Sequence, residues 1–188
     1  MKGSFMYIEA RDFFLKNGQK IILRSPDMFD AAQLLEHMKI TSGETVYMSR
    51  YPEEISVSVE QQARYLQMIE NDPDNFMLAA YIGDKLVGNA GVTRVRDNIK
   101  YRHRANFGIS LQESVCGLGL GSLMLHEVLE IAKKTSFEQL ELTVFGDNVR
   151  AIRLYEKIGF VKTGVLPRAY RLKDGNYHDE VQMVYMVK

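Results

Sequence analysis

Three glycines at alternate positions, Gly117, Gly119 and Gly121, stand where a predicted strand passes into a predicted helix. The first N–H groups of a helix have no partner within the helix, and that end carries about half a positive charge. Because glycine has no side chain to block an approaching group, a phosphate can reach those N–H groups. The loop is therefore suited to a diphosphate. The alternative is that the glycines only allow the helix to pack closely on the strand.

Two other phosphate-binding loops do not fit this segment. A Walker A loop would need Gly-Lys-Ser/Thr, whereas Gly121 is followed by Ser122 and Leu123. A Rossmann fingerprint would need its third glycine one residue later, at Ser122, and an acidic residue on a following second strand. Neither requirement is met, so the loop alone does not identify its ligand.

A second motif lies downstream, in NVRAIRLYEKIGF. Its Asn148, Ala151, Tyr155, Gly159 and Phe160 match the signature Asn-x-x-Ala-x-x-x-Tyr-x-x-x-Gly-Phe of the GNAT superfamily of N-acetyltransferases. One predicted helix and one predicted strand separate the two motifs, as in that family. The chain therefore resembles the GNAT N-acetyltransferases, which bind acetyl-coenzyme A (acetyl-CoA).

The resemblance covers residues 20–188, which leaves 1–19 as an N-terminal extension of a single domain, 1–188. The family's glycine signature, Gln/Arg-x-x-Gly-x-Gly/Ala, is matched at its two glycines but has Cys116 at its first position. From His103 to the C-terminus the sequence is similar to the branch that contains spermidine and ribosomal-protein N-terminal acetyltransferases. We expect acetyl-CoA binding to survive the change at Cys116, because backbone amides make most of the phosphate contacts. Cys116 itself is interpreted as a small loop residue, with a nucleophile as the alternative.

The resemblance implies a set of cofactor-binding residues and no metal. The N–H groups of the glycine loop would hold the diphosphate, the pantetheine arm would lie along the preceding strand, and the second motif would contact the same ligand. These residues are Ile109, Leu111, Gly117, Leu118, Gly119, Leu120, Gly121, Ser122, Asn148, Ala151 and Tyr155. Asn148 also suits a helix cap, and the two roles are compatible.

Tyr155 is the residue to which the resemblance assigns catalysis, as the acid that protonates the departing thiolate of coenzyme A. A positioned acid of this kind contributes about 10²–10⁴-fold to a rate. Residues 151, 152, 155 and 158 share one face of the predicted helix, so a tyrosine of the hydrophobic core is the alternative.

The general base is less defined, because related enzymes often carry Glu where this chain has Asn106. At pH 7, freeing a lysine-like amine costs about 4.6 kcal/mol, whereas freeing an α-amino group costs about 1 kcal/mol. A site without a strong base therefore favours a less basic amine or a water relay. The remaining candidates for a base or for an anchor of a cationic substrate are Glu44, Glu53, Glu54 and His103. A solvated loop (for the glutamates) and an ordinary strand-end histidine are the alternatives.

The elements that would position these residues form an α/β fold. The pattern predicts a strand at 18–25, two helices, a hairpin around Gly83-Asp84, a strand at 103–111, and a helix to about Lys134. A strand at 139–145, a helix capped by Asn148 and closing strands follow. We expect a GNAT-type mixed sheet that is mostly antiparallel and flanked by helices. Its parallel strands, ending at Leu111 and Phe145, would splay to hold acetyl-CoA.

The first predicted helix begins after Ser25-Pro26-Asp27 and is expected to bury Phe29, Leu34, Leu35 and Met38. The loops at 40–56 and 165–180 are expected to shape the acceptor pocket. The final strand, VQMVYMV, is apolar, and we predict that it offers an edge through which two chains could pair as a homodimer.

Composition limits the remaining function classes. The 24 basic and 24 acidic residues cancel, which argues against nucleic acid and anionic membranes as partners. Charges interrupt the N-terminal segment and no apolar stretch is long enough to span a membrane, so we expect a cytoplasmic protein. One cysteine excludes an internal disulfide. The sequence thus predicts an acetyl-CoA-dependent N-acetyltransferase that acts directly on a primary amine of a small molecule, polyamine or peptide N-terminus. The alternative is a non-catalytic acyl-CoA-binding sensor or partner module.

Overall fold

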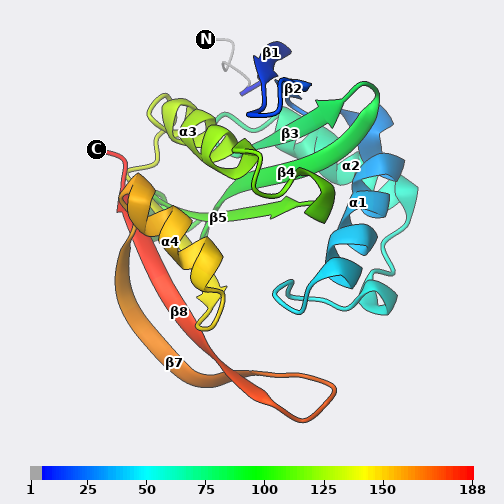
Figure 1. Ribbon diagram of the computed structural model, residues 1–188. Helices are drawn as coiled ribbons and strands as arrows, with labels where there is room; N and C mark the ends of the chain where they lie inside the picture. The colour runs from blue at the N-terminus through cyan, green and yellow to red at the C-terminus, as the bar shows by residue number, and fades with distance from the viewer. Residues whose placement is uncertain (1–5) are drawn as a thin grey trace.

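The structure is a computed structural model and describes residues 6–188 as one mixed sheet with helices on both faces (Figure 1). The eight strands lie in the order β1-β2-β3-β4-β5-β6-β8-β7. Their bounds are β1 Arg11–Phe14, β2 Lys20–Arg24, β3 Phe76–Ile82, β4 Lys85–Arg94, β5 Arg104–Leu111, β6 Gln139–Phe145, β7 Val161–Arg171 and β8 Tyr177–Met186. The helices are α1 Ala31–Glu44, α2 Val59–Glu70, α3 Leu120–Ala132 and α4 Val149–Ile158. Short 3₁₀ turns lie at Met28–Asp30, Pro52–Glu54, Ile99–Tyr101 and Glu113–Val115.

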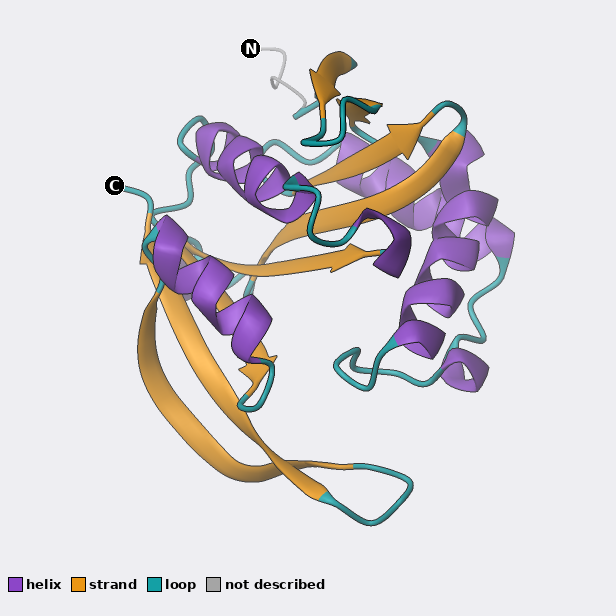
Figure 2. Cartoon of the chain, in the orientation of Figure 1, coloured by secondary structure: helices purple, strands orange, loops and turns teal. Residues whose placement is uncertain are grey.

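The helices divide between the two faces of the sheet (Figure 2). On one face, α3 and α4 bury the larger hydrophobic core, which includes the fully buried Leu120, Met124 and Leu140. On the other face, α1 and α2 cover a smaller cluster that includes Leu34 and Leu66. All strand pairs are antiparallel except β5 with β6, as the sequence predicted.

The parallel pair is joined over only a short length. β5 and β6 share the register Arg104↔Gln139, Ala105↔Leu140 and Asn106↔Glu141. Beyond that point β5 continues beside β4 as far as Leu111, and β6 continues beside β8 as far as Phe145. The two strands therefore diverge after their third pair, which confirms the expected splay.

Backbone geometry confirms the predicted hairpin and shows how other elements begin, end and pair. The hairpin of β3 and β4 turns at Gly83, whose φ is 56°. Ser58 and Gln61 form a capping box at the start of α2. Gly159 ends α4 in the left-handed conformation with φ 112°, where glycine is favoured. β6 lies between β5 and β8, in the interior of the sheet.

The prediction for the first helix is wrong at its start. Phe29 lies in the 3₁₀ turn before α1 and is 85% exposed, because Asp27 caps that turn and directs the chain differently from a regular helix. Met38 is only half-buried, whereas Leu34 and Leu35 are buried as expected.

The predicted edge strand is also placed differently. β8 is bonded on both sides, to β6 and to β7, so VQMVYMV is an interior strand and offers no free edge. The free edge on this side belongs to β7, most of whose side chains are exposed. Two chains therefore cannot pair through β8, whose two edges are both occupied.

Part of the predicted N-terminal extension joins the sheet. Residues Arg11–Phe14 form the edge strand β1, which pairs with β2. The turn between these strands contacts the segment before α3, because the N–H of Lys16 donates to the carbonyl oxygen of Leu118 at 3.1 Å.

Candidate cofactor and acceptor site

Residues 116–122, here called the glycine loop, lead from the 3₁₀ turn Glu113–Val115 into the first turn of α3. Gly117 and Gly119 have φ of 83° and 94°, which side chains rarely adopt. Gly121 is different, because a Cβ there would lie 3.2 Å from Leu154 and 3.4 Å from Leu111. Gly121 thus allows α3 to approach α4 and β5, whereas Gly117 and Gly119 shape the loop. The two interpretations of the glycines apply to different positions.

The N–H groups of residues 117–122 have no hydrogen-bond partner within residues 6–188. Gly119 is the N-cap of α3 and brings no side chain to satisfy them. A run of unpaired N–H groups at a helix N-terminus, on a backbone without side chains in the way, fits an anionic group such as a diphosphate.

β5 presents an unpaired edge next to the glycine loop. After Asn106 the edge that faces β6 has no strand partner, and Ile109 and Leu111 lie in this open part, both half-buried. An extended amide-containing chain could hydrogen-bond to such an edge as an added strand does.

Tyr155 lies on α4 and is 8% exposed. Its ring packs edge-on against Phe107, with centroids 6.3 Å apart, and at a tilt against Phe160, with centroids 5.8 Å apart. Burial raises the pKa of Tyr155 to about 12, so the phenol keeps its proton at neutral pH. This state suits a proton or hydrogen-bond donor, and it also suits a tyrosine of the core.

Asn148 acts as the cap of α4. Its side-chain oxygen accepts a hydrogen bond from the N–H of Ala151 at 3.2 Å. The residue thereby fixes the start of the helix that carries Tyr155, four residues after Ala151.

The side chains on the other face of β5, β6 and β8 form a surface that we call the open face. Strand neighbours of these residues belong to the core under α3 and α4, so the alternating side chains point to the opposite side. Helices α1 and α2 pack there against β3, β4 and β5. The open face comprises Asn106, Ser110, Thr143, Phe145 and Glu180.

An aromatic cluster occupies one end of the open face. Phe145 stacks on Tyr170 with ring centroids 3.8 Å apart, and Tyr47 meets Phe145 edge-on at 5.5 Å. The hydroxyl of Tyr170 donates to a carboxylate oxygen of Glu180 at 2.7 Å. Burial and this bond to Glu180 raise the pKa of Tyr170 to about 12. The cluster joins the loop after α1 to the β7–β8 hairpin.

The three predicted glutamates, Glu44, Glu53 and Glu54, are all exposed. Glu44 accepts from the N–H of Glu113 at 2.8 Å, which places it close to the glycine loop. Glu54 accepts from the N–H of Tyr51 at 2.7 Å and closes its own 3₁₀ turn. Glu53 forms an ion pair with Lys173. The structure therefore ties this loop to the β7–β8 hairpin but shows no contact of these carboxylates with Tyr155. That the segments 40–56 and 165–180 shape the acceptor pocket stays a prediction.

His103 and Asn106 lie near the start of β5, at the opposite end of the strand from Leu111. The carbonyl of His103 accepts the N–H groups of Glu138 and Gln139, so this residue helps to start β6. Its position argues for the ordinary strand-end histidine rather than for a base at the glycine loop.

Sequence analysis missed His37, a buried histidine on α1. Its side chain is 1% exposed and its Nε2 lies 2.8 Å from Oγ of Ser110 on the open face. Burial lowers the pKa of His37 to about 4, so the ring is neutral at pH 7. Its Nδ1 is buried without a partner among the described residues. The signal in the sequence was its spacing of three from Leu34, which puts both residues on one face of the helix.

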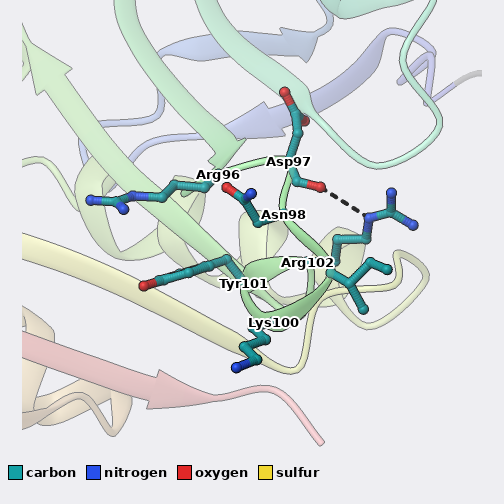
Figure 3. Close-up of a pocket in the computed structure, with 7 residues that line it drawn as sticks. Arg96, Asp97, Asn98, Lys100, Tyr101 and Arg102 are labelled. Atoms are coloured by element: carbon teal, nitrogen blue, oxygen red, sulfur yellow. Dashed lines mark hydrogen bonds between the residues drawn. The ribbon is translucent and has the colours of Figure 1, made fainter.

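A separate surface hollow is formed by consecutive residues 96–102, with Arg102 Nε donating to the carbonyl oxygen of Asp97 at 3.1 Å (Figure 3). This turn precedes β5 and is therefore remote from the glycine loop, which follows that strand. No residue of the two motifs lines the hollow.

Within the described part of the chain, no group of three or more His, Cys, Asp or Glu residues is arranged to hold a metal ion. Residues 6–188 also contain no helix with the length and hydropathy that a membrane crossing requires.

Comparisons with known proteins agree with this geometry. The profile described as "Acetyltransferase (GNAT) family" matches residues 42–160. L-amino acid N-acetyltransferase AaaT of Escherichia coli (strain K12) is 30% identical over 118 residues, which cover 62% of this chain and 72% of AaaT. N-alpha-acetyltransferase RimI of Mycobacterium tuberculosis (strain ATCC 25618 / H37Rv) is 31% identical over 100 residues, or 53% of this chain and 61% of RimI. The crystal structure of an acetyltransferase of the GNAT family from Streptococcus pneumoniae superposes with a TM-score of 0.85 at 27% identity, covering 89% of this chain and 99% of that one.

Proposed function

The chain belongs to the GNAT family of acetyltransferases, which use acetyl-CoA, and from this premise we propose that it transfers the acetyl group directly to an α-amino group. The acceptor would be a free amino acid or the N-terminus of a peptide. The candidate bases support this proposal, because Glu44, Glu53 and Glu54 make other contacts and Asn106 cannot take a proton.

The pKa of the acceptor amine decides which kind of amine such a site can use. An α-amino group has a pKa near 7.8 and is partly neutral at pH 7, whereas a lysine-like amine has a pKa near 10.4. A site without a strong base can use the first kind of amine at a cost of about 1 kcal/mol and the second at about 4.6 kcal/mol. The names of the two relatives, an L-amino acid and an N-alpha acetyltransferase, describe acceptors of the first kind.

The residues of the chain divide the work as follows. The N–H groups of 117–122 would bind the diphosphate, and the open edge of β5 at Ile109 and Leu111 would align the pantetheine arm. When bound, acetyl-CoA supplies an activated acetyl thioester. Tyr155, kept protonated by burial, would donate its proton to the leaving sulfur. The amine would approach from the open face and lose its proton to water, and water would return a proton to Tyr155.

The proposed function is tested with the full chain, acetyl-CoA and a panel of amines, measuring release of free thiol. The panel includes amino acids, peptides with free N-termini, the same peptides with blocked N-termini, and polyamines. We expect release with the α-amines and at least tenfold less with polyamines at pH 7. Faster release with polyamines would overturn the choice of acceptor. Tight acetyl-CoA binding without thiol release from any amine would favour the sensor instead.

A further inference from the structure

We propose that Lys16 and Arg150 form a cationic clamp over the glycine loop and bind the phosphate groups of acetyl-CoA. This inference rests on the proposed function, because it takes residues 117–122 as the diphosphate site. Lys16 lies outside residues 42–160, the part of the chain that the family profile matches. Arg150 is not one of the motif residues that the resemblance assigns. The inference therefore comes from the placement of these two side chains.

Lys16 reaches the loop from the β1–β2 turn, which lies beside the beginning of α3 (Figure 1). Its backbone N–H is bonded to the carbonyl of Leu118 at 3.1 Å. Its side-chain stem lies against Gly119, because a Cβ built on that glycine would be 3.4 Å from Cε of Lys16 and 3.5 Å from Cγ. The ammonium group is thereby held near the N-terminus of α3.

Arg150 approaches the same loop from a different element. It is the second residue of α4 and is exposed. A Cβ built on Gly117 would lie 3.9 Å from Nη2 of Arg150. Two cations from the N-terminal hairpin and from α4 thus converge on the two glycines whose left-handed backbone shapes the loop.

Neither cation is neutralised within residues 6–188. The other basic groups of the N-terminal hairpin have carboxylate partners, since Arg11 pairs with Glu127 and Lys20 pairs with Asp12. Lys16 and Arg150 form no ion pair with any described residue. Within the hairpin the uncompensated charge is therefore at Lys16, beside the loop, whereas Arg150 is one of several basic residues of α4 without an ion pair among residues 6–188.

The arrangement is electrostatically unfavourable in the free protein. A helix N-terminus carries partial positive charge, so cations beside it raise the free energy of the fold, whereas anions lower it. Here two uncompensated cations join a run of unpaired N–H groups. An anion bound between them removes this repulsion. The two cations and the unpaired N–H groups therefore favour binding of a ligand with several negative charges, although they do not stabilise the free protein.

The chemistry of the two side chains matches the phosphates of acetyl-CoA. This molecule has a diphosphate and a 3′-phosphate, and cations form strong charge-assisted hydrogen bonds to such oxygens. Arginine can bind two phosphate oxygens at once, whereas lysine acts as a point charge on a flexible stem. The clamp also accounts for a loop that has Cys116 where the family pattern has Gln or Arg, because the charge comes from elsewhere in the fold.

The test measures binding by isothermal titration calorimetry with the full chain and its variants Lys16→Met, Lys16→Arg and Arg150→Met. Matched controls are Lys20→Met in the same hairpin and Lys157→Met at the far end of α4. We expect Lys16→Met and Arg150→Met each to weaken acetyl-CoA binding about tenfold. Lys16→Arg and both controls should stay within about twofold of the parent protein. Thermal unfolding of each variant checks that it is folded.

Three ligands then locate the contact. S-acetylpantetheine carries no diphosphate, and its binding should be unchanged in both variants. Dephospho-coenzyme A lacks only the 3′-phosphate, so a loss that persists with it assigns the clamp to the diphosphate, and a loss that disappears assigns it to the 3′-phosphate. Unchanged acetyl-CoA binding by folded Lys16→Met and Arg150→Met would overturn the clamp. Failure of the parent protein to bind acetyl-CoA would instead overturn the proposed function.

Discussion

The glycine loop and the open face differ in how they are built. The loop takes its binding groups from the backbone of one continuous segment, residues 117–122, and glycine is needed there because of the path of the chain. The open face collects side chains from β5, β6, β8, α1 and the loop after α1. A backbone site keeps its ligand class as long as the path of the chain is kept, and neighbouring cations such as Lys16 and Arg150 adjust only its affinity, whereas a side-chain site changes its ligand with each substitution. We therefore expect the loop to set the cofactor and the open face to set the acceptor.

The largest expected effect separates a catalytic role of Tyr155 from a role in the core. Tyr155→Phe should lower kcat about 10²–10⁴-fold, because the proton donor is lost while the packed ring remains. Binding of acetyl-CoA, measured by calorimetry, should change less than twofold. The comparison variant Tyr170→Phe should raise KM for the acceptor with little change in kcat, since Tyr170 lies in the aromatic cluster of the open face. Equal kcat in Tyr155→Phe and the parent protein would assign Tyr155 to the core.

The next effect tests whether the loop acts through its backbone. Gly119→Val places a branched side chain at φ 94° and against Lys16, so acetyl-CoA affinity should fall at least tenfold, on the order of 1.4 kcal/mol or more. Gly175→Val is the matched control, because Gly175 has φ 89° in the β7–β8 turn with open space around it. Both variants should lose stability, but only the change at Gly119 should weaken binding. Equal losses of binding in the two variants would contradict a local role of the loop.

A third prediction concerns His37, which contacts Ser110 of the open face, and the pH dependence of the free energy of unfolding. The pKa of His37 is about 4 in the fold and 6.5 in an ordinary setting, so the unfolded chain binds the proton first as pH falls. The free energy of unfolding should therefore decrease between pH 6.5 and pH 4, by about 3 kcal/mol in total. Urea unfolding at a series of pH values measures this, and His37→Gln should reduce the slope by one proton. An unchanged slope in that variant would show that His37 does not titrate as described.

The smallest effect concerns the bridge between the two loops that border the open face. Lys173→Met removes the ion pair with Glu53, which is exposed and should contribute less than about 1 kcal/mol to stability. We expect KM for the acceptor to rise about two- to fivefold, because the loop holding Tyr47 and Tyr51 is less restrained. Acetyl-CoA affinity should not change. A loss of acetyl-CoA binding in this variant would show that the two regions are not independent.

The contrast between a site made from one continuous segment and a site made from distant segments explains what could be predicted from the sequence. The two motifs placed the glycine loop and α4 correctly because each motif is local, and its spacing determines its geometry. Lys16 and His37 could not be identified in this way, since each acts across the fold on residues far along the chain. The edge position expected for the last strand was wrong because its apolar pattern does not say that β7 folds back beyond it. Phe29 was misplaced because a 3₁₀ turn with an Asp27 cap changes the helical phase.

The short junction between β5 and β6 has a mechanical consequence. With only three residue pairs in register, the strands β1 to β5 and the strands β6 to β8 meet along a short seam, which a thermal fluctuation can open more easily than the longer pairings of β3 with β4, β4 with β5 and β6 with β8. A pantetheine chain bonded along β5 would lengthen that seam and lock the two parts together. Amide hydrogen exchange at the ends of β5 and β6 should then slow as more of the protein binds the ligand. The ligand would thus stabilise the junction between the two parts of the sheet as well as react.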